Sequence, residues 1–313
     1  MNRGTRCLVT GGAGFIGSHL VRRLVSSGAE VRVVDDLSSG RVANLEGVRA
    51  EIVRADLVSA DLAQLVRGVE VVFHLAAIPS VPRSVREPLR THAAAATATL
   101  RLLEAARDAG VRRFVNSSSS SVYGDVASPP MRETMPTLPR SPYAVAKLAA
   151  EGYTRAFAGL FGLSTVSLRY FNVFGPRQDP ASQYAAVVPR FITAYLERRP
   201  PLVYGDGRQS RDFTYVDNVV DANILAADAS DLSGQSVNVA AGEPRSVLAL
   251  LDAIAASIGQ GIDPAFEPPR AGDIRDSHAD VSLARELLGY EPRIPFDEGL
   301  RRTIDWFTER ARG

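Results

Sequence analysis

The sequence predicts an α/β fold in two parts, a doubly wound parallel sheet followed by a smaller mixed α/β lobe at the C-terminus. Short apolar runs rich in Val and Leu alternate with longer amphipathic stretches through the first half, which is the pattern of βαβ units. A glycine-rich turn joins the first apolar run to the first amphipathic stretch. From Phe171 onward, Pro, Gly and short mixed elements dominate, and this change predicts the lobe.

The first half is expected to form six strands of one sheet, because apolar runs joined by helical stretches lie parallel to one another. The expected strands are Arg6–Thr10, Val31–Asp35, Ala50–Arg54, Val69–His74, Arg112–Asn116 and Thr165–Tyr170. The expected helices are Phe15–Ser27, Leu62–Val66, Pro88–Ala109 and Pro142–Leu160. Further helices are expected near Ala185–Glu197, Val216–Ala229, Ser246–Ile258 and Phe296–Arg310.

The composition argues against several classes of partner. The 36 Lys+Arg against 35 Asp+Glu give a net charge of +1, so no bulk attraction to nucleic acid or to an anionic membrane is expected. The single cysteine, Cys7, lies in the first apolar run and is expected to be a small buried hydrophobe. No apolar stretch reaches the roughly 18 residues of a membrane span. A cytoplasmic protein without a metal site is therefore expected.

The glycine-rich turn predicts a dinucleotide site. It follows a strand and opens a helix, so bare backbone amides and a helix N-terminus lie where a pyrophosphate binds. The residues expected around the pyrophosphate are Gly11, Gly14, Phe15, Ile16 and Gly17. Asp35 ends the second strand, where a carboxylate accepts the hydroxyls of the adenosine ribose and repels a 2′-phosphate. NAD is therefore expected rather than NADP, with Asp36 as a second candidate for the ribose.

A tyrosine and a lysine are expected to form a proton-handling pair. Ser141 and Pro142 are a helix cap and a first-turn proline, so a helix begins just before Tyr143 and brings Lys147 onto the same face. A tyrosine with its usual pKa near 10 is a poor base at neutral pH. A nearby ammonium and a helix N-terminus both favour the phenolate.

Five segments together resemble the extended short-chain dehydrogenase/reductase family, and the match spans nearly the whole chain. They are Thr10–Gly17, Asp56-Leu57, His74–Ala77, Tyr143-x-x-x-Lys147 and Arg169–Asn172. The resemblance implies that residues 1–170 are the NAD-binding Rossmann domain and residues 171–313 the nucleotide-sugar-binding lobe, with segments that cross this soft boundary. It also implies that the cofactor is lined by Asp56, Leu57, Leu75, Ala76, Ala77 and Tyr170, in addition to Tyr143 and Lys147.

The family motif also selects the third catalytic residue, Ser119, four positions before Tyr123. A hydroxyl there stabilises negative charge as it develops on the sugar oxygen. Ser120 is the next candidate for catalysis and substrate contact, whereas Ser117 and Ser118 are expected to be polar loop residues. Dehydrating members place an acidic pair after the motif hydroxyl, and decarboxylases carry a glutamate where Ser121 stands. The serines found here therefore predict reversible epimerisation at C4 through a 4-keto sugar.

The lobe is similar to that of UDP-hexose and UDP-N-acetylhexosamine 4-epimerases, which implies a nucleotide-diphosphate sugar as substrate, most simply a UDP sugar. Two arginines are expected to bind the diphosphate, because a guanidinium presents a planar fork to it. The residues implied in substrate binding are Asn172, Val188, Arg211, Arg270, Asp273 and Ser277, with Ser119 and Ser120. A serine at position 277 leaves room for an N-acetyl group, where some relatives carry a large side chain.

One departure from the family concerns a helix that precedes the serine-rich strand. Relatives usually carry an asparagine in an N-x-x-G-T-like run, and Ala95 takes that place here. His92 is a possible substitute, although a helix-surface histidine is the simpler interpretation. The resemblance further implies a homodimer through the helices Pro88–Ala109 and Pro142–Leu160.

Several other functions stay open at this point. They are 4-epimerisation of a UDP-uronic acid or of a dTDP- or GDP-linked sugar, and reduction of a nucleotide sugar with release of NADP. Asp35 counts against NADP, and Asn172 counts against a uronate, because uronate epimerases tend to have threonine there. Outside the enzymes, a non-catalytic NAD-sensing interaction protein is the alternative, and it predicts a broken Tyr/Lys pair.

Overall fold

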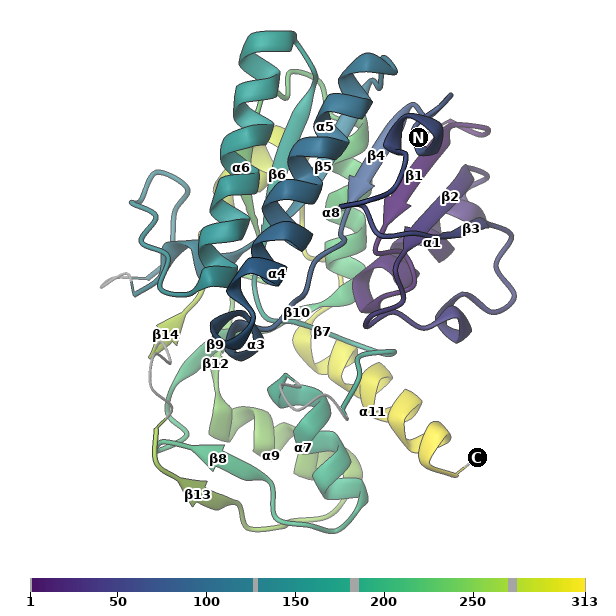
Figure 1. Cartoon of the computed structure of the whole chain (residues 1–313). Coiled ribbons are helices and arrows are strands. Elements are labelled where there is room, and N and C mark those ends of the chain that lie inside the picture. Colours follow the sequence, from purple (N-terminus) through teal and green to yellow (C-terminus); the bar gives the residue numbers. More distant parts are fainter. Residues whose placement is uncertain (1, 126–128, 181–185, 270–274, 313) are drawn as a thin grey trace.

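The computed structural model describes residues 2–125, 129–180, 186–269 and 275–312 (Figure 1). Its centre is a seven-stranded parallel sheet in the order β11-β6-β5-β4-β1-β2-β3. The order of the first six strands is that of the Rossmann fold, so the predicted fold class is confirmed. The strands are β1 (Arg6–Thr10), β2 (Glu30–Asp35), β3 (Glu51–Arg54), β4 (Val71–His74), β5 (Arg113–Ser119), β6 (Thr165–Tyr170) and β11 (Gln235–Val239).

Helices cover both faces of the sheet. On one face α1 (Phe15–Ser26) packs beside α8 (Val216–Asp228), and on the other α5 (Ala98–Asp108) packs beside α6 (Pro142–Phe161). Successive residues of a strand point to opposite faces, so Val9 joins the core under α1 and α8 while Leu8 joins the core under α5 and α6. Cys7 is buried in the first of these cores, as expected.

The helix expected over Pro88–Ala109 is interrupted. It consists of α4 (Pro88–His92), a π-helical turn over Ala93–Thr97, and then α5. A π-turn inserts one extra residue into the helix and occurs mostly at functional sites. Hydrophobic periodicity did not predict the π-turn, because its five residues are all small and show no contrast between an apolar and a polar face.

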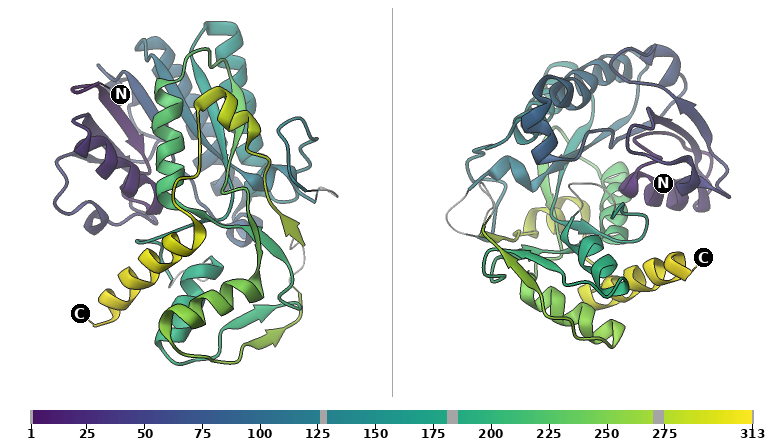
Figure 2. Two further views of the ribbon diagram at one scale, coloured as in Figure 1. Left: turned by 180° about the vertical axis from the view of Figure 1, so that it is seen from behind. Right: turned by 60° about the horizontal axis from the view of Figure 1, so that its bottom comes forward.

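The lobe lies at the carboxyl ends of the strands, where α7 (Val187–Leu196), α9 (Val247–Ile258) and α11 (Phe296–Arg312) pack together (Figures 1 and 2). They enclose a core of their own that includes Val188, Phe191 and Phe296. The short lobe strands are β7 (Val173–Phe174), β8 (Leu202–Tyr204), β9 (Ser210–Asp212), β10 (Thr214–Tyr215), β12 (Pro244–Ser246), β13 (Ala265–Glu267) and β14 (Asp276–Ser277). Three further short helices are α2 (Leu62–Leu65), α3 (Val81–Arg86) and α10 (Ser282–Leu288).

The chain returns to the sheet after entering the lobe. Helix α8 packs on α1, and β11 pairs in parallel with β6, so a division at residue 170 separates the chain only in part. The seventh strand was not predicted because three of its five residues are polar, namely Gln235 and the two inner residues Ser236 and Asn238. Both are buried and hydrogen-bonded, to Glu151 and Tyr123 respectively, so they fit a sheet interior although the run does not look apolar.

None of the helices within the described ranges is both long and apolar enough to cross a bilayer.

Candidate active site

The glycine turn after β1 brings backbone close to backbone. Gly11 has φ +67°, and a Cβ there would lie 2.8 Å from the amide nitrogen of Ala76. A Cβ on Gly17 would lie 2.1 Å from the Gly11 carbonyl oxygen, so α1 can pack this closely on the turn only because residue 17 is glycine. Gly14 is the N-cap of α1, and because glycine has no side chain, no side-chain hydrogen bond covers the first amides of the helix. The cradle and its amides fit a pyrophosphate.

The half-buried Phe15 and Ile16 begin α1 and pack toward the lobe core.

Two carboxylates lie at the end of β2, and they differ in burial and in the hydrogen bonds that they accept. Asp35 is buried and accepts from the amides of Ala13 (3.0 Å) and Leu37 (2.9 Å), which ties it to the glycine turn. Burial raises the pKa of Asp35, and the two amides oppose that shift. Asp36 is exposed and accepts from Ser38 within its own turn. Asp35 is thus the carboxylate beside the cofactor cradle.

The remaining cofactor-lining candidates divide into two groups. Leu75, Ala76 and Ala77 follow β4 and are half-buried beside Gly11. Asp56 is exposed and accepts from the Val58 amide, and the neighbouring Leu57 is buried in the core under α5.

The last of these candidates, Tyr170, ends β6. It lies in the core under α1 and α8, and its hydroxyl bonds to Asn223 on α8, so only its backbone is available to a cofactor.

Tyr143 and Lys147 lie one turn apart at the start of α6. The helix begins as predicted, because the Ser141 side chain accepts from the Ala144 amide and Pro142 occupies the first turn. Lys147 is buried, and its Nζ donates to the Ser117 carbonyl oxygen at 2.6 Å. Burial lowers the pKa of Lys147 to about 8, and the Glu151 carboxylate opposes that shift. Burial also raises the pKa of Tyr143, and a hydrogen bond with the Ser119 hydroxyl opposes it.

The serine run belongs to the sheet rather than to a loop. Ser117, Ser118 and Ser119 end β5 and pair in register with Leu168, Arg169 and Tyr170 of β6, so the expectation of a polar loop at Ser117 and Ser118 was wrong. The backbone amides and carbonyls of these serines form ladder hydrogen bonds with β6. A strand can therefore continue through residues with polar side chains.

The direction of the hydrogen bonds around Ser119 is informative. Its Oγ accepts from the Ser121 amide (3.2 Å) and the Ser121 hydroxyl (2.9 Å), so its own proton remains available to Tyr143. Ser120 begins the short 3-10 turn that follows and is half-buried.

The lobe brings two predicted substrate residues together. Strand β14 pairs with β9 so that Ser277 lies opposite Arg211, 66 residues earlier in the chain. Ser277 is buried, and Arg211 donates to the carbonyls of Ser210 and Arg275. Asn172 has φ +30° and its carbonyl accepts from the Thr214 amide. Val188 is buried in the lobe core, whereas Arg270 and Asp273 lie outside the described residues.

The model of the NAD dependent epimerase/dehydratase family matches residues 7–240. The chain belongs to this family. The resemblance inferred from the five sequence segments is thereby confirmed, and so is NAD as the cofactor.

Individual members of the family are similar over almost their whole length. The UDP-glucose 4-epimerase of Mycolicibacterium smegmatis is 44% identical over 316 residues, which cover 98% of this chain and 99% of that protein. The structure of the UDP-N-acetylglucosamine 4-epimerase of Methanobrevibacter ruminantium has a TM-score of 0.95 at 42% identity, covering 98% and 99% of the two chains. The UDP-glucose 4-epimerase of Thermotoga maritima has a TM-score of 0.94 at 40% identity, covering 98% and 100%.

In this epimerase/dehydratase family member, a buried histidine joins the glycine turn to the π-turn. His74 Nδ1 lies 2.7 Å from Thr10 Oγ1, and Nε2 lies 2.9 Å from Thr99 Oγ1. Thr99 donates its only proton to the Ala95 carbonyl, so Nε2 of His74 must be the donor and Nδ1 the acceptor. The imidazole is neutral, because burial lowers its pKa to about 3.

Position 95, where the chain departs from the family, holds a buried alanine. Ala95 is buried in a small cluster with Ala96 and Ala146, next to Lys147, and its carbonyl is held by Thr99. His92 is exposed and does not substitute for the missing asparagine. His74, which sequence reasoning had assigned only to a family motif, is the residue that hydrogen-bonds to both Thr10 and Thr99.

The sequence also carried a signal for Lys147 that was not used. Lys147 is the only lysine of the chain, and every other Lys+Arg position is arginine. A compact ammonium suits a buried site whose proton affinity must be adjusted, whereas a guanidinium stays charged and is bulkier.

Proposed function

We propose that this protein is an NAD-dependent UDP-sugar 4-epimerase, which interconverts UDP-glucose with UDP-galactose and UDP-N-acetylglucosamine with UDP-N-acetylgalactosamine. One observation carries the proposal: Tyr143, Lys147 and Ser119 converge, and the residues after Ser119 are Ser120 and Ser121 rather than acids. Without an added acid, neither dehydration nor decarboxylation is supported at this position. The similarity to the relatives named above supports the same activity.

The glycine turn and Asp35 would hold NAD, because the turn leaves no space for side chains and Asp35 lies directly beside it. When bound, NAD would supply reversible hydride transfer at C4 of the sugar, by way of a 4-keto sugar whose two faces are both open to reduction. The side chains of this protein then have to move one proton on and off the 4-hydroxyl. A protein that does this undergoes no net redox change.

Tyr143 is the base that takes the 4-hydroxyl proton. Burial raises the Tyr143 pKa, and in the proposed mechanism the Lys147 ammonium and the N-terminus of α6 stabilise the phenolate against it. Ser119 accepts two hydrogen bonds from Ser121, so its proton is available for the sugar oxygen or for Tyr143. This donor is present before the reaction begins, which is the condition for electrostatic stabilisation of the developing charge.

In the lobe, Arg211 and Arg270 would bind the diphosphate with Asn172 as an additional ligand, Asp273 would contact the substrate, and Ser277 would set the size of the sugar pocket. The register of β14 on β9 supports the last assignment, since Ser277 is buried directly opposite Arg211. Ser277→Tyr is therefore expected to lower kcat/KM for UDP-N-acetylglucosamine at least about 10-fold while UDP-glucose turnover is retained. Equal turnover of the N-acetyl sugar in the variant would remove Ser277 from this role.

The activity is tested without added cofactor. The bound cofactor is released from purified protein and identified, and UDP, dTDP and GDP sugars, including UDP-glucuronic acid, are screened for 4-epimers. Tightly held NAD and epimerisation of UDP sugars with no net redox change are expected. Obligatory consumption of NADH or NADPH would overturn the proposal in favour of a reductase, and turnover of UDP-glucuronic acid alone would favour a uronate epimerase.

We also propose a homodimer. Helix α6 exposes Val145, Tyr153 and Leu160 along one side, and Leu89 on the adjoining α4 is 85% exposed. Exposed apolar side chains on neighbouring helices are typical of an interface, and a twofold axis would pair these helices into a four-helix seam. Sedimentation of Leu160→Glu beside the unchanged protein tests this: the unchanged protein is expected to be a dimer at micromolar concentration, and a monomer would refute it.

A further inference from the structure

A buried ion pair lies directly behind the catalytic pair. Glu151 is on α6, one turn after Lys147, and Arg169 is on β6. Arg169 Nε donates to Glu151 Oε1 at 2.9 Å, and Nη2 donates to Oε2 at 2.7 Å. The two side chains are only 2% and 4% exposed. Because desolvation offsets most of what a buried pair gains, such a pair is weak evidence for stability and calls for another explanation.

Two serines complete the shell of the Glu151 carboxylate. Ser118 donates to Oε1, and Ser236 on β11 donates to Oε2 at 2.9 Å. Four hydrogen bonds from three neighbouring strands thus converge on one carboxylate. Ser118 is also the register partner of Arg169, so the carboxylate bridges the ends of β5 and β6 at one level of the sheet.

The position of Ser118 connects this carboxylate to the reaction. The preceding residue, Ser117, supplies the carbonyl that accepts from Lys147 Nζ at 2.6 Å. The following residue, Ser119, supplies the hydroxyl that bonds to Tyr143. Glu151 therefore holds the one peptide segment that carries both the acceptor of the lysine and the hydroxyl beside the tyrosine.

The guanidinium is held from its other side as well. The Arg169 carbon Cζ lies 4.7 Å from the centre of the Tyr123 ring, and the Tyr123 hydroxyl donates to Asn238 at 2.7 Å. Tyr123 ends the 3-10 turn that begins at Ser120. Both ends of the catalytic serine segment are thus connected to the same ion pair.

We propose that Glu151, held by Arg169, is a positioning residue of the active site that fixes the Ser117–Ser119 backbone and places a negative charge beside the Lys147 ammonium. The proposal rests on the proposed function. The titratable groups around Lys147 are Tyr143 and Glu151 on α6, the neutral His74 on β4, and Arg169 bound to Glu151. Among these, Glu151 is the group that opposes the lowering of the Lys147 pKa by burial.

The charge is tested directly through the single lysine. Protein labelled with [ε-13C]lysine gives one lysine side-chain resonance, and its pH titration in NAD-loaded protein reports Lys147 alone. Glu151→Gln is expected to lower the Lys147 pKa by about 1 unit or more, because the desolvation and the Arg169 charge remain while the carboxylate charge is lost. Its kcat is expected to fall at least about 10-fold with KM changed little. An unchanged Lys147 titration in this variant would overturn the proposal.

The positioning is tested with a matched pair of serine variants. Ser118→Ala and Ser236→Ala each remove one donor to the same carboxylate, but only Ser118 lies between Ser117 and Ser119. Ser118→Ala is expected to lower kcat at least about 5-fold, and Ser236→Ala less than about 2-fold, since a lost hydrogen bond matters here only through the reacting groups. Equal effects of the two variants would overturn the proposal.

A double variant separates positioning from folding. Glu151→Leu with Arg169→Met replaces the pair by apolar groups of similar size, which is commonly neutral or stabilising. Folding and NAD content are expected to be preserved while kcat stays at least about 10-fold low, and wild-type kcat in this variant would overturn the proposal. If the unchanged protein epimerises no UDP sugar, the proposed function fails, yet the lysine titration still decides whether Glu151 acts on Lys147.

Discussion

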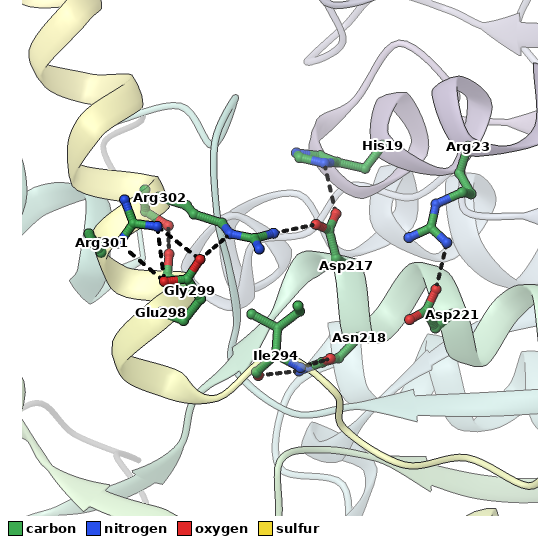
Figure 3. A network of polar contacts seen from close by, with 11 residues as sticks. His19, Arg23, Asp217, Asn218, Asp221, Ile294, Glu298, Gly299, Arg301 and Arg302 are labelled. Carbon is green, nitrogen blue, oxygen red and sulfur yellow. Dashed lines mark hydrogen bonds and ion pairs between the residues drawn. The ribbon is translucent and has the colours of Figure 1, made fainter. Parts of the chain in front are cut away.

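Two networks of ion pairs between basic side chains and carboxylates differ in burial. The first is the Glu151–Arg169 pair behind Lys147, with side chains 2% and 4% exposed. The second joins α1, α8 and α11, where Asp217 contacts His19 at 3.6 Å and Arg302 at 3.6 Å (Figure 3). There the side chains of Asp217 and Arg302 are 30% and 41% exposed. The residue types are alike, but water reaches only the second network.

The second network connects the lobe to the sheet rather than serving the chemistry. Arg302 on α11 also donates to Glu298, and Arg23 on α1 pairs with Asp221 on α8. In the same region, Asn218 exchanges two hydrogen bonds with the backbone of Ile294, ahead of α11. Solvated ion pairs are screened and individually weak, so they orient elements without fixing atoms. The contrast teaches that ion pairs of the same kind position reacting groups only where water is excluded.

The largest effect is expected within the buried region. Tyr143→Phe removes the proton acceptor and is expected to lower kcat about 10³-fold, within the usual range for loss of a general base. NAD content and the thermal midpoint should stay near those of the unchanged protein, because the phenyl ring keeps the packing. Turnover is measured with UDP-glucose and cofactor content by acid release. A kcat within 10-fold of the unchanged protein would assign the base elsewhere.

The next largest effect is on stability. Arg169→Met leaves the Glu151 carboxylate buried without its cation, and removal of one partner of a buried pair costs about 3–5 kcal/mol. Chemical denaturation measures this loss. The double variant with Glu151→Leu serves as the control and should recover most of the stability. If Arg169→Met lowers the free energy of unfolding no more than substitution of an exposed arginine does, the two networks do not differ in their effect on stability.

The pH dependence sharpens the comparison further. The Lys147 pKa is lowered to about 8, and in the proposed mechanism its ammonium is the form that stabilises the Tyr143 phenolate. Because the Tyr143 pKa is raised while that of Lys147 is lowered, activity is expected to rise with pH below about 8 as the phenolate forms, and to level off above about 8 as loss of the ammonium offsets each gain in phenolate. Stability should rise above pH about 8. Between pH about 8 and the ordinary lysine pKa, Lys147 binds more protons in the unfolded chain than in the folded protein. The free-energy cost of burying Lys147 therefore falls as the pH rises over this range. A kcat that keeps rising about 10-fold per pH unit well above pH 8 would contradict the assigned role of Lys147.

The smallest effect is expected in the exposed network. Arg302→Met removes the contacts to Asp217 and Glu298, yet it should lower Tm by no more than about 2 °C, because both partners remain hydrated. Raising the salt concentration to about 1 M should remove most of the difference between the variant and the unchanged protein. A larger, salt-independent loss would show that α11 is held as rigidly as α6.

The parts of this site that the sequence alone determined are local. A strand, a glycine turn and a helix follow one another around Gly11–Gly17, and Asp35 ends the next strand, so short-range rules place them. Ser141 and Pro142 begin α6, and helical spacing brings Tyr143 and Lys147 together. Each of these relations involves a turn, a cap or one helical repeat, for which chain geometry leaves little freedom.

Only the tertiary structure decided the contacts between distant segments. The sequence does not reveal that Arg169 meets Glu151, that His74 joins Thr10 to Thr99, or that Ser277 lies opposite Arg211. Nor does it place β11 at the edge of the sheet. The physical reason is that a buried polar residue looks like an exposed one in the sequence. Its partner is fixed by strand order and register, and these depend on how the whole core packs.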